Sequence, residues 1–359
     1  MLQIIPKIVL PLCVSFAVTG CGGGEEVASV ADQSSTAMSA KAVAVLPTTS
    51  TLNPLPTDAI FSPTSFWYQQ IPVNTPLHAN SAGFVADFLR QKVAYYNTVG
   101  VNTTAYASPV YSVPAAQPTK KINQWQCMPN FALNPGLAQQ WAAVPWPDYA
   151  QPAAGSDAEM TIYQKSSDSL WEFWQTRNTS GQWVACWGGK MSNVSQSDGR
   201  WPSIYGTTAT GLPFLGGQVT AEELARGEIR HAIGIALPEV EAASTISWPA
   251  MRGDGSNPQN AANRIPQGTR LRLDPSVNVD ALNLRPATKV IAKAAQKYGF
   301  VVWDKSGAIG IRVQNPKSYT AMGQVNPYPA LFNNAPEWAW LEGIPWNKLQ
   351  FMPMNYGKP

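Results

Sequence analysis

Leu170-Trp-Glu-Phe-Trp174 is the centre of the most regularly patterned part of the chain, which runs from Asp157 to Leu237. Short polar clusters separate three apolar runs, at Met160–Gln164, Ser169–Thr176 and Gln182–Gly188. Aromatic and β-branched runs bounded by Gly, Ser, Asn and Asp predict an antiparallel meander. One helical turn at Thr220–Arg226 and a fourth extended run at Glu228–Leu237 are expected to follow it.

Glu172 is a candidate general acid because it lies on this strand among bulky apolar side chains. Period-two alternation places it on the same face as Leu170 and Trp174, with equally bulky residues on the other face. We therefore expect the strand to be covered on both sides, and burial would raise the pKa of the carboxyl group. The alternative is a structural carboxylate that bonds Arg177, Arg200 or a backbone edge.

Tryptophans near this strand are candidates for substrate binding. A tight turn at 178–181 would place Trp187 nearly opposite Glu172. An indole face can cover the apolar C–H face of a pyranose, so this arrangement suits a sugar-binding cleft. The predicted sugar-contacting residues are Trp174, Trp187 and Trp201.

His231 lies on the apolar face of the fourth run, whose opposite face carries only Arg230 and small residues. Such a small-residue face lets another layer or a ligand approach closely. One interpretation is a histidine at the edge of the core, and the other is a catalytic base in a cleft. A carboxylate partner, Asp157, Glu172 or Asp198, would fix its tautomer.

The composition argues against a polyanionic partner. Charged residues make up 13% of the 359 residues, the formal net charge is +3, and the chain holds 14 Trp and 12 Tyr. No Lys/Arg run occurs. We therefore expect no binding to nucleic acid, whose recognition needs a basic patch or stripe.

Residues 1–20 are predicted to be a lipoprotein signal peptide. Lys7 precedes an apolar run, Ile8–Val18, that is too short to cross a membrane as a helix. Val18-Thr-Gly-Cys21 resembles the lipobox of bacterial lipoproteins, which implies cleavage before Cys21 and its acylation; an ordinary secretory signal is the alternative. We expect an exported outer-membrane lipoprotein, periplasmic or surface-facing, anchored to lipid through Cys21, with residues 21–59 as a flexible tether.

The cysteines predict one disulfide. Cys13 leaves with the signal peptide and Cys21 is acylated, so Cys127 and Cys186 remain and are expected to pair outside the cytoplasm. Two cysteines and two distant histidines lack the spacing of a zinc site. Because no nucleotide, nucleophile-elbow or metalloprotease motif is present either, we expect no metal and no cofactor.

Two helices are predicted. Asn80 and Ser81 precede a helix whose apolar face is formed by Phe84, Val85, Phe88, Leu89 and Val93. The second helix begins at Pro286 and reaches about Tyr298, and Gly299 ends it.

The remaining pattern is that of a β-rich protein. Residues 270–274 predict a strand, and residues 300–304 and 308–313 predict a hairpin. Many short strands with Gly and Pro turns favour a single, mainly β domain over residues 60–359, with the two helices packed on a β-sandwich of jelly-roll type.

Part of the chain resembles an uncharacterised group of secreted bacterial proteins. That resemblance implies a shared domain but no activity. It rests on Gly211-Leu-Pro-Phe-Leu, Gly227-Glu-Ile-Arg-His-Ala232, Trp248-Pro-Ala250, Gly268-Thr-Arg-Leu-Arg-Leu273 and Lys297-Tyr-Gly299.

Two functions stay open at this point. The first is an enzyme on extracellular or envelope polysaccharide: a hydrolase with Glu172 as acid and Asp157 or Asp198 as second carboxylate, or a lyase with His231 as base and Arg230 neutralising a uronate. The second is a non-catalytic glycan-binding or envelope-structural lipoprotein. We expect a monomer in either case.

Overall fold

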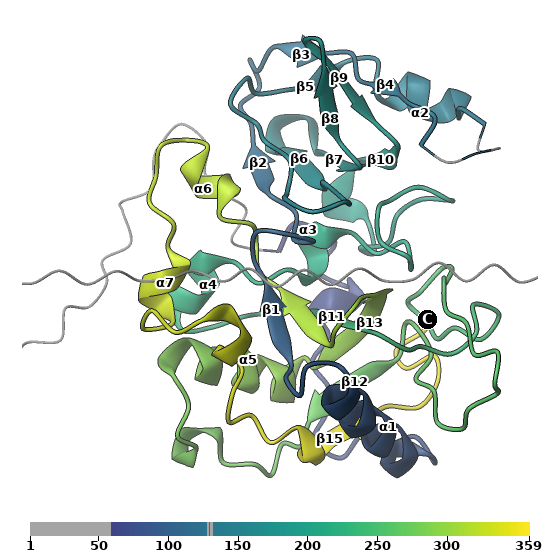
Figure 1. Ribbon diagram of the computed structural model, residues 1–359, viewed down its shortest axis with the longest axis vertical. Coiled ribbons are helices and arrows are strands. Elements are labelled where there is room, and N and C mark those ends of the chain that lie inside the picture. Colours follow the sequence, from purple (N-terminus) through teal and green to yellow (C-terminus); the bar gives the residue numbers. More distant parts are fainter. Residues whose placement is uncertain (1–58, 128, 130–131) are drawn as a thin grey trace, which may run out of the picture. The chain divides into compact units, whose positions relative to one another are not determined.

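The computed structural model describes residues 59–127, 129 and 132–359. These residues form a mixed α/β fold with four open sheets, and no sandwich or barrel is identified among them (Figure 1). The predicted jelly-roll sandwich consists of antiparallel strands, whereas each of the three larger sheets contains a parallel pair. The predicted signal peptide, the acylated Cys21 and the tether up to residue 58 lie outside the described residues.

The largest sheet contains six strands. Their order is β1 (Gly100–Asn102), β14 (Gly310–Arg312), β11 (Ile233–Leu237), β13 (Phe300–Lys305), β12 (Arg270–Leu273) and β15 (Leu349–Phe351). Because β11 lies between β13 and β14, the hairpin predicted for these two strands is wrong. All five residues of β11 are buried, and a strand buried on both faces belongs in the interior of a sheet.

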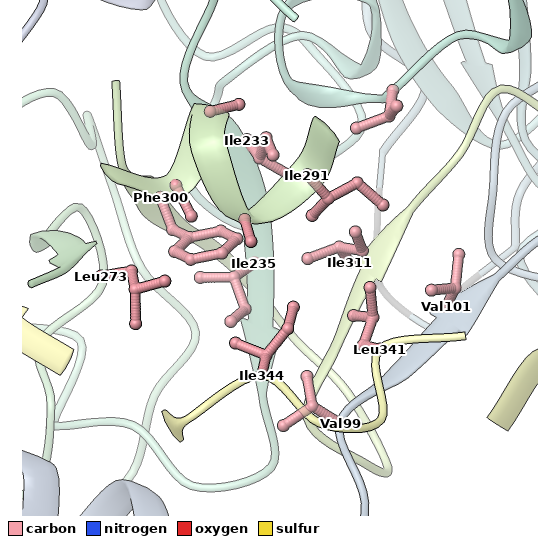
Figure 2. Packing of buried hydrophobic residues seen from close by; sticks show 14 of the residues in the cluster. Val99, Val101, Ile233, Ile235, Leu273, Ile291, Phe300, Ile311, Leu341 and Ile344 are labelled. Carbon is pink, nitrogen blue, oxygen red and sulfur yellow. The ribbon is translucent and has the colours of Figure 1, made fainter. Parts of the chain in front are cut away.

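Both predicted helices are confirmed. They are α1 (Ser81–Ala94) and α5 (Pro286–Lys297), with Gly299 at a φ of +74° after the second. Their buried side chains join Ile233 and Ile235 in one apolar core, in which Ile291 of α5 contributes from the helix (Figure 2). Val93 departs from the prediction, because it lies at the end of α1 and is 69% exposed.

The other face of β11 holds Ala232, Gly234 and Ala236 against a second apolar cluster. A Cβ atom on Gly234 would lie 2.3 Å from the ring of Trp303. The prediction that this small-residue face admits another layer is therefore confirmed. Leu170 belongs to the same cluster and connects it to the second sheet.

The second sheet has the order β10 (Trp187–Ser192), β7 (Ser169–Trp174), β6 (Met160–Gln164) and β2 (Val110–Ser112). The β6–β7 hairpin is confirmed. Both faces of β7 are covered, because Trp171 and Phe173 belong to a third apolar cluster. The third predicted strand is split: β9 (Gln182–Ala185) joins another sheet, and β10 pairs with β7. The predicted pairing of Trp187 with Glu172 is wrong by two residues, because Trp187 lies opposite Trp174 and Gly189 lies opposite Glu172.

Two smaller sheets and several short helices make up the rest of the regular secondary structure. Cys127 and Cys186 form the predicted disulfide beside these sheets. The sheets pair β3 (Thr119–Lys120) with β5 (Val144–Pro145), and β4 (Asn123–Gln124) with β9 and β8 (Arg177–Thr179). The short helices are α2 (Pro135–Gln140), α3 (Phe214–Gly217), α4 (Ala221–Arg226), α6 (Lys317–Thr320) and α7 (Tyr328–Leu331), with 3-10 turns at Phe66–Tyr68, Lys165–Ser167, Val194–Gln196, Val279–Ala281, Glu337–Ala339 and Trp346–Lys348.

Candidate functional site

Glu172 is fully buried, and hydrogen-bond donors occupy both of its carboxylate oxygens. Oε2 accepts from Nε1 of Trp201 at 3.1 Å and from Oγ1 of Thr207 at 2.8 Å, and Oε1 accepts from the backbone N–H of Phe214 at 2.6 Å. Burial raises the pKa of Glu172 to about 7, although these hydrogen bonds act to lower it. The carboxylate ties the start of α3 to β7, and it does not line the pocket beside His231 or the groove beside Tyr96, which are described below.

Neither of the other two predicted carboxylates makes a hydrogen bond to the Glu172 cluster among the described residues. Asp198 forms an ion pair with Arg200 at 2.7 Å. Asp157 lies half-buried in the bend before β6 and accepts a hydrogen bond from Oγ of Ser156 at 3.4 Å. Glycoside hydrolysis requires two carboxyl groups on either side of one bond, and the assignment of Asp157 or Asp198 as the second of them stays a prediction.

The predicted sugar-binding tryptophans occupy different environments. Trp201 is 1% exposed and serves as a donor to Glu172, so its indole face cannot cover a sugar. Trp187 is half-buried and stacks on Tyr205 with ring centroids 6.2 Å apart. Trp174 lies opposite Trp187 and is also half-buried.

His231 pairs with a carboxylate, but its partner is Glu223 and not one of the three predicted residues, Asp157, Glu172 and Asp198. Its Nδ1 lies 2.8 Å from the carbonyl oxygen of Ala232, and its Nε2 lies 3.1 Å from Oε1 of Glu223. The carbonyl oxygen accepts from Nδ1–H, and an ionised Glu223 accepts from Nε2–H of a protonated ring, so the geometry suits an imidazolium beside a carboxylate. Burial by itself would lower the pKa of His231, but the charge and hydrogen bond of Glu223 raise it above its ordinary value.

Glu223 is held in place by a capping box at the start of α4. Its Oε2 accepts from the backbone N–H and from Oγ1 of Thr220, each at 2.9 Å, and Thr220 Oγ1 accepts from the N–H of Glu223. Burial opposes ionisation here too, yet the charge of His231 lowers the pKa of Glu223. Both ring nitrogens of His231 and both carboxylate oxygens of Glu223 are engaged in these contacts, so His231 is not placed to act as a base. The Thr-x-x-Glu spacing was the sequence signal for Glu223, and it indicated only a cap.

A pocket of about 560 Å³ opens beside this pair. Arg230, predicted to neutralise a uronate, lies on its wall, 62% exposed and ion-paired with Glu228 at 2.8 Å. The residues that line the pocket include Ile60, Tyr68, Leu215, Arg230, His231 and Tyr298.

A larger groove of about 830 Å³ lies between the C-terminal end of α1, β1 and the segment 337–346. Tyr96 and Trp338 line it with exposed fractions of 82% and 59%. Tyr96 follows α1 at a φ of +66°, and Oγ1 of Thr98 donates to the carbonyl oxygen of Trp338 at 3.0 Å. Residues so far apart in sequence gave no local signal of a shared groove.

Polar side chains line the same groove. Carboxylates, amides and an ammonium group of this kind hydrogen-bond sugar hydroxyls. They are Glu337, Glu342, Asn97, Asn102 and Lys92.

Glu159 is a buried carboxyl group with no hydrogen-bond partner for either oxygen among the described residues. Burial raises its pKa to about 8, and the nearby charge of Arg312 acts in the opposite direction. Arg312 donates to Oδ2 of Asp304 at 2.9 Å, while its Nε and Nη1 have no hydrogen-bond partner in the part of the chain that the structure describes. Sequence analysis selected Asp157 and passed over Glu159, two residues away, because an alternating pattern shows that a side chain is buried but not what it faces.

Neither a membrane span nor a metal centre is found in the part of the chain that the structure describes. No helix there has the length and apolar character needed to cross a bilayer. No three His, Cys, Asp or Glu side chains in the same residues are grouped as cation ligands.

No protein-family model, curated protein or solved structure matches this chain. The resemblances to a lipobox and to a group of secreted bacterial proteins therefore stay predictions from sequence.

Proposed function

We propose that this protein is an exported, membrane-anchored lipoprotein that binds extracellular or envelope polysaccharide without cleaving it. The observation that carries the proposal is the pair of exposed aromatic side chains, Tyr96 and Trp338, in one groove that carboxylate and amide groups also line. Soluble monomers expose few large aromatic side chains unless they form a contact surface. Aromatic faces cover pyranose rings, and the polar groups orient the hydroxyls.

The enzymatic alternatives lose support from the same geometry. Glu172 has its oxygens bonded and lines neither the pocket nor the groove, and His231 has both nitrogens committed. A general acid or base has to reach the reacting atoms of the substrate. Binding without cleavage does not require an acid or base at the reacting atoms.

The test is binding of the exported protein to a panel of soluble polysaccharides, measured by affinity electrophoresis and calorimetry. An aromatic contact contributes on the order of 1 kcal/mol, so Tyr96→Ala and Trp338→Ala should each weaken binding roughly fivefold. Tyr106→Ala is the matched control, because Tyr106 is 40% exposed and lies outside the groove. Unchanged affinity in both groove variants would refute the proposal, as would new reducing ends or unsaturated sugars after incubation.

A further inference from the structure

The groove that contains Tyr96 and Trp338 carries an excess of negative charge. Among the described residues that line it, the charged side chains are one lysine and two glutamates, Lys92, Glu337 and Glu342. One ammonium group and two carboxylates leave one negative charge in excess, although the whole chain has a formal net charge of +3. The charge of the groove is therefore opposite in sign to that of the protein, and it discriminates among glycans.

The lysine is committed to the shape of the groove. Nζ of Lys92 donates to the carbonyl oxygen of Asn97 at 2.9 Å and to Oδ1 of the same residue at 3.3 Å. These bonds join the last turn of α1 to the loop that holds Tyr96 at a φ of +66°. Two of the three ammonium hydrogens are thus in use.

Glu337 also has a structural task. Its Oε1 accepts a hydrogen bond from Oγ1 of Thr103, the residue that directly follows β1. This bond ties the segment 337–346 to the edge strand of the largest sheet.

Glu342 is the carboxylate of the groove that is left for a ligand. It is exposed, and its side chain takes part in no hydrogen bond or ion pair with any residue that the structure describes. The three residues before it, 339–341, are buried, whereas Trp338 and Glu342 on either side of them are exposed. These two side chains therefore share the solvent side of one helical segment, four residues apart, which is the spacing of neighbours on a helix surface.

We infer that the glycan bound in this groove carries free amino groups, and that one ammonium group binds between the carboxylate of Glu342 and the ring of Trp338. The inference rests on the proposed function and names its substrate class. A carboxylate pairs with an ammonium group, and an indole face attracts a cation within about 6 Å of its centre. An uncharged sugar makes only the aromatic and hydroxyl contacts, and a uronic acid would add a third negative charge beside the two glutamates.

Three hexasaccharides with the same linkage test the inference: those of glucosamine, N-acetylglucosamine and glucose. They differ only at the second ring carbon, which carries an ammonium, an acetamide or a hydroxyl group. Calorimetry on the exported protein is performed in low salt at about pH 5.5, where a sugar amine carries its proton. The glucosamine hexamer should bind roughly fivefold more tightly than the other two. This preference should disappear at about 1 M salt, where exposed charges are screened.

Three variants separate the charge from the aromatic contact. Glu342→Gln should remove the preference for the glucosamine hexamer, because it removes the unpaired carboxylate. Asp148→Asn is the matched control and should keep the preference, since Asp148 is a 90% exposed carboxylate that does not line the groove. Trp338→Ala should weaken the binding of all three hexamers.

The outcomes distinguish failure of the inference from failure of the proposed function. Equal binding of the three hexamers to wild type, weakened alike by Trp338→Ala, would overturn the inference and leave the proposed glycan binding in place. A preference that persists in Glu342→Gln, or tighter binding of the acetylated hexamer, would overturn the inference as well. No binding of any hexamer would also overturn it, and no binding across the polysaccharide panel would refute the proposed function too.

Discussion

Glu159 should make the stability of this protein fall as the pH rises. Its carboxyl group is 1% exposed, and burial raises its pKa from 4.5 to about 8. A group with a raised folded-state pKa favours folding below its unfolded pKa, and that contribution is lost as the pH rises through the folded value. At about 1.4 kcal/mol per pH unit, the separation of the two values amounts to about 5 kcal/mol, of which about 4 kcal/mol is lost by pH 8.

The substitution that tests this is Glu159→Gln, because glutamine has nearly the shape of the neutral carboxyl group and does not ionise. Wild type and variant should be similarly stable at pH 4, and the variant should be more stable by about 4 kcal/mol at pH 8. Urea unfolding with the disulfide intact, at several pH values, measures the difference. Glu342→Gln, on the surface, controls for the loss of one negative charge. A wild-type-to-variant difference that stays constant within about 1 kcal/mol from pH 4 to pH 8 would refute the reasoning.

Three further predictions concern other parts of the chain. Glu172→Gln should lower the free energy of unfolding by about 1–3 kcal/mol, because its amide faces donors instead of accepting from them; a melt that matches wild type would show that the hydrogen bonds are not needed. Reducing Cys127–Cys186, whose residues are 59 apart in sequence, should cost about 4 kcal/mol in the chain-entropy model, and unfolding curves with and without reductant measure it; equal midpoints would contradict it. Cys21→Ser should block signal cleavage and release the protein from membrane fractions. A variant that is processed and fractionates like wild type would show that the lipobox prediction is wrong.

Local elements could be predicted from the sequence because local forces determine them. The boundaries of α1 and α5 follow from apolar periodicity, from Pro286 at a helix start and from Gly299 at a left-handed φ. The β6–β7 hairpin follows from alternation and turn residues. Each of these signals lies within about 15 residues, and each of the three predicted elements is present in the structure.

Strand pairing could not be predicted in the same way. The hairpin predicted for β13 and β14 fails because β11, more than 60 residues earlier in the chain, inserts between them. Nothing in residues 300–313 encodes that insertion. The only relevant signal lies in β11 itself, whose apolar and small-residue faces are both suited to burial.

The candidate sites were also hard to predict, because their chemistry depends on contacts between residues that are distant in sequence. Sequence patterns selected Glu172 and His231 because each is an ionisable group on an apolar strand, and such groups are costly to bury unless their hydrogen bonds are satisfied. The structure satisfies both, through residues 29–42 positions away for Glu172 and eight for His231. The exposed aromatic side chains of the groove lie outside regular alternation: Tyr96 comes just after a helix and Trp338 lies in a 3-10 turn. Neighbouring strands in the sheet position the side chains of a regular strand, and these side chains become buried in the core. In this fold the binding surfaces therefore come from the irregular segments.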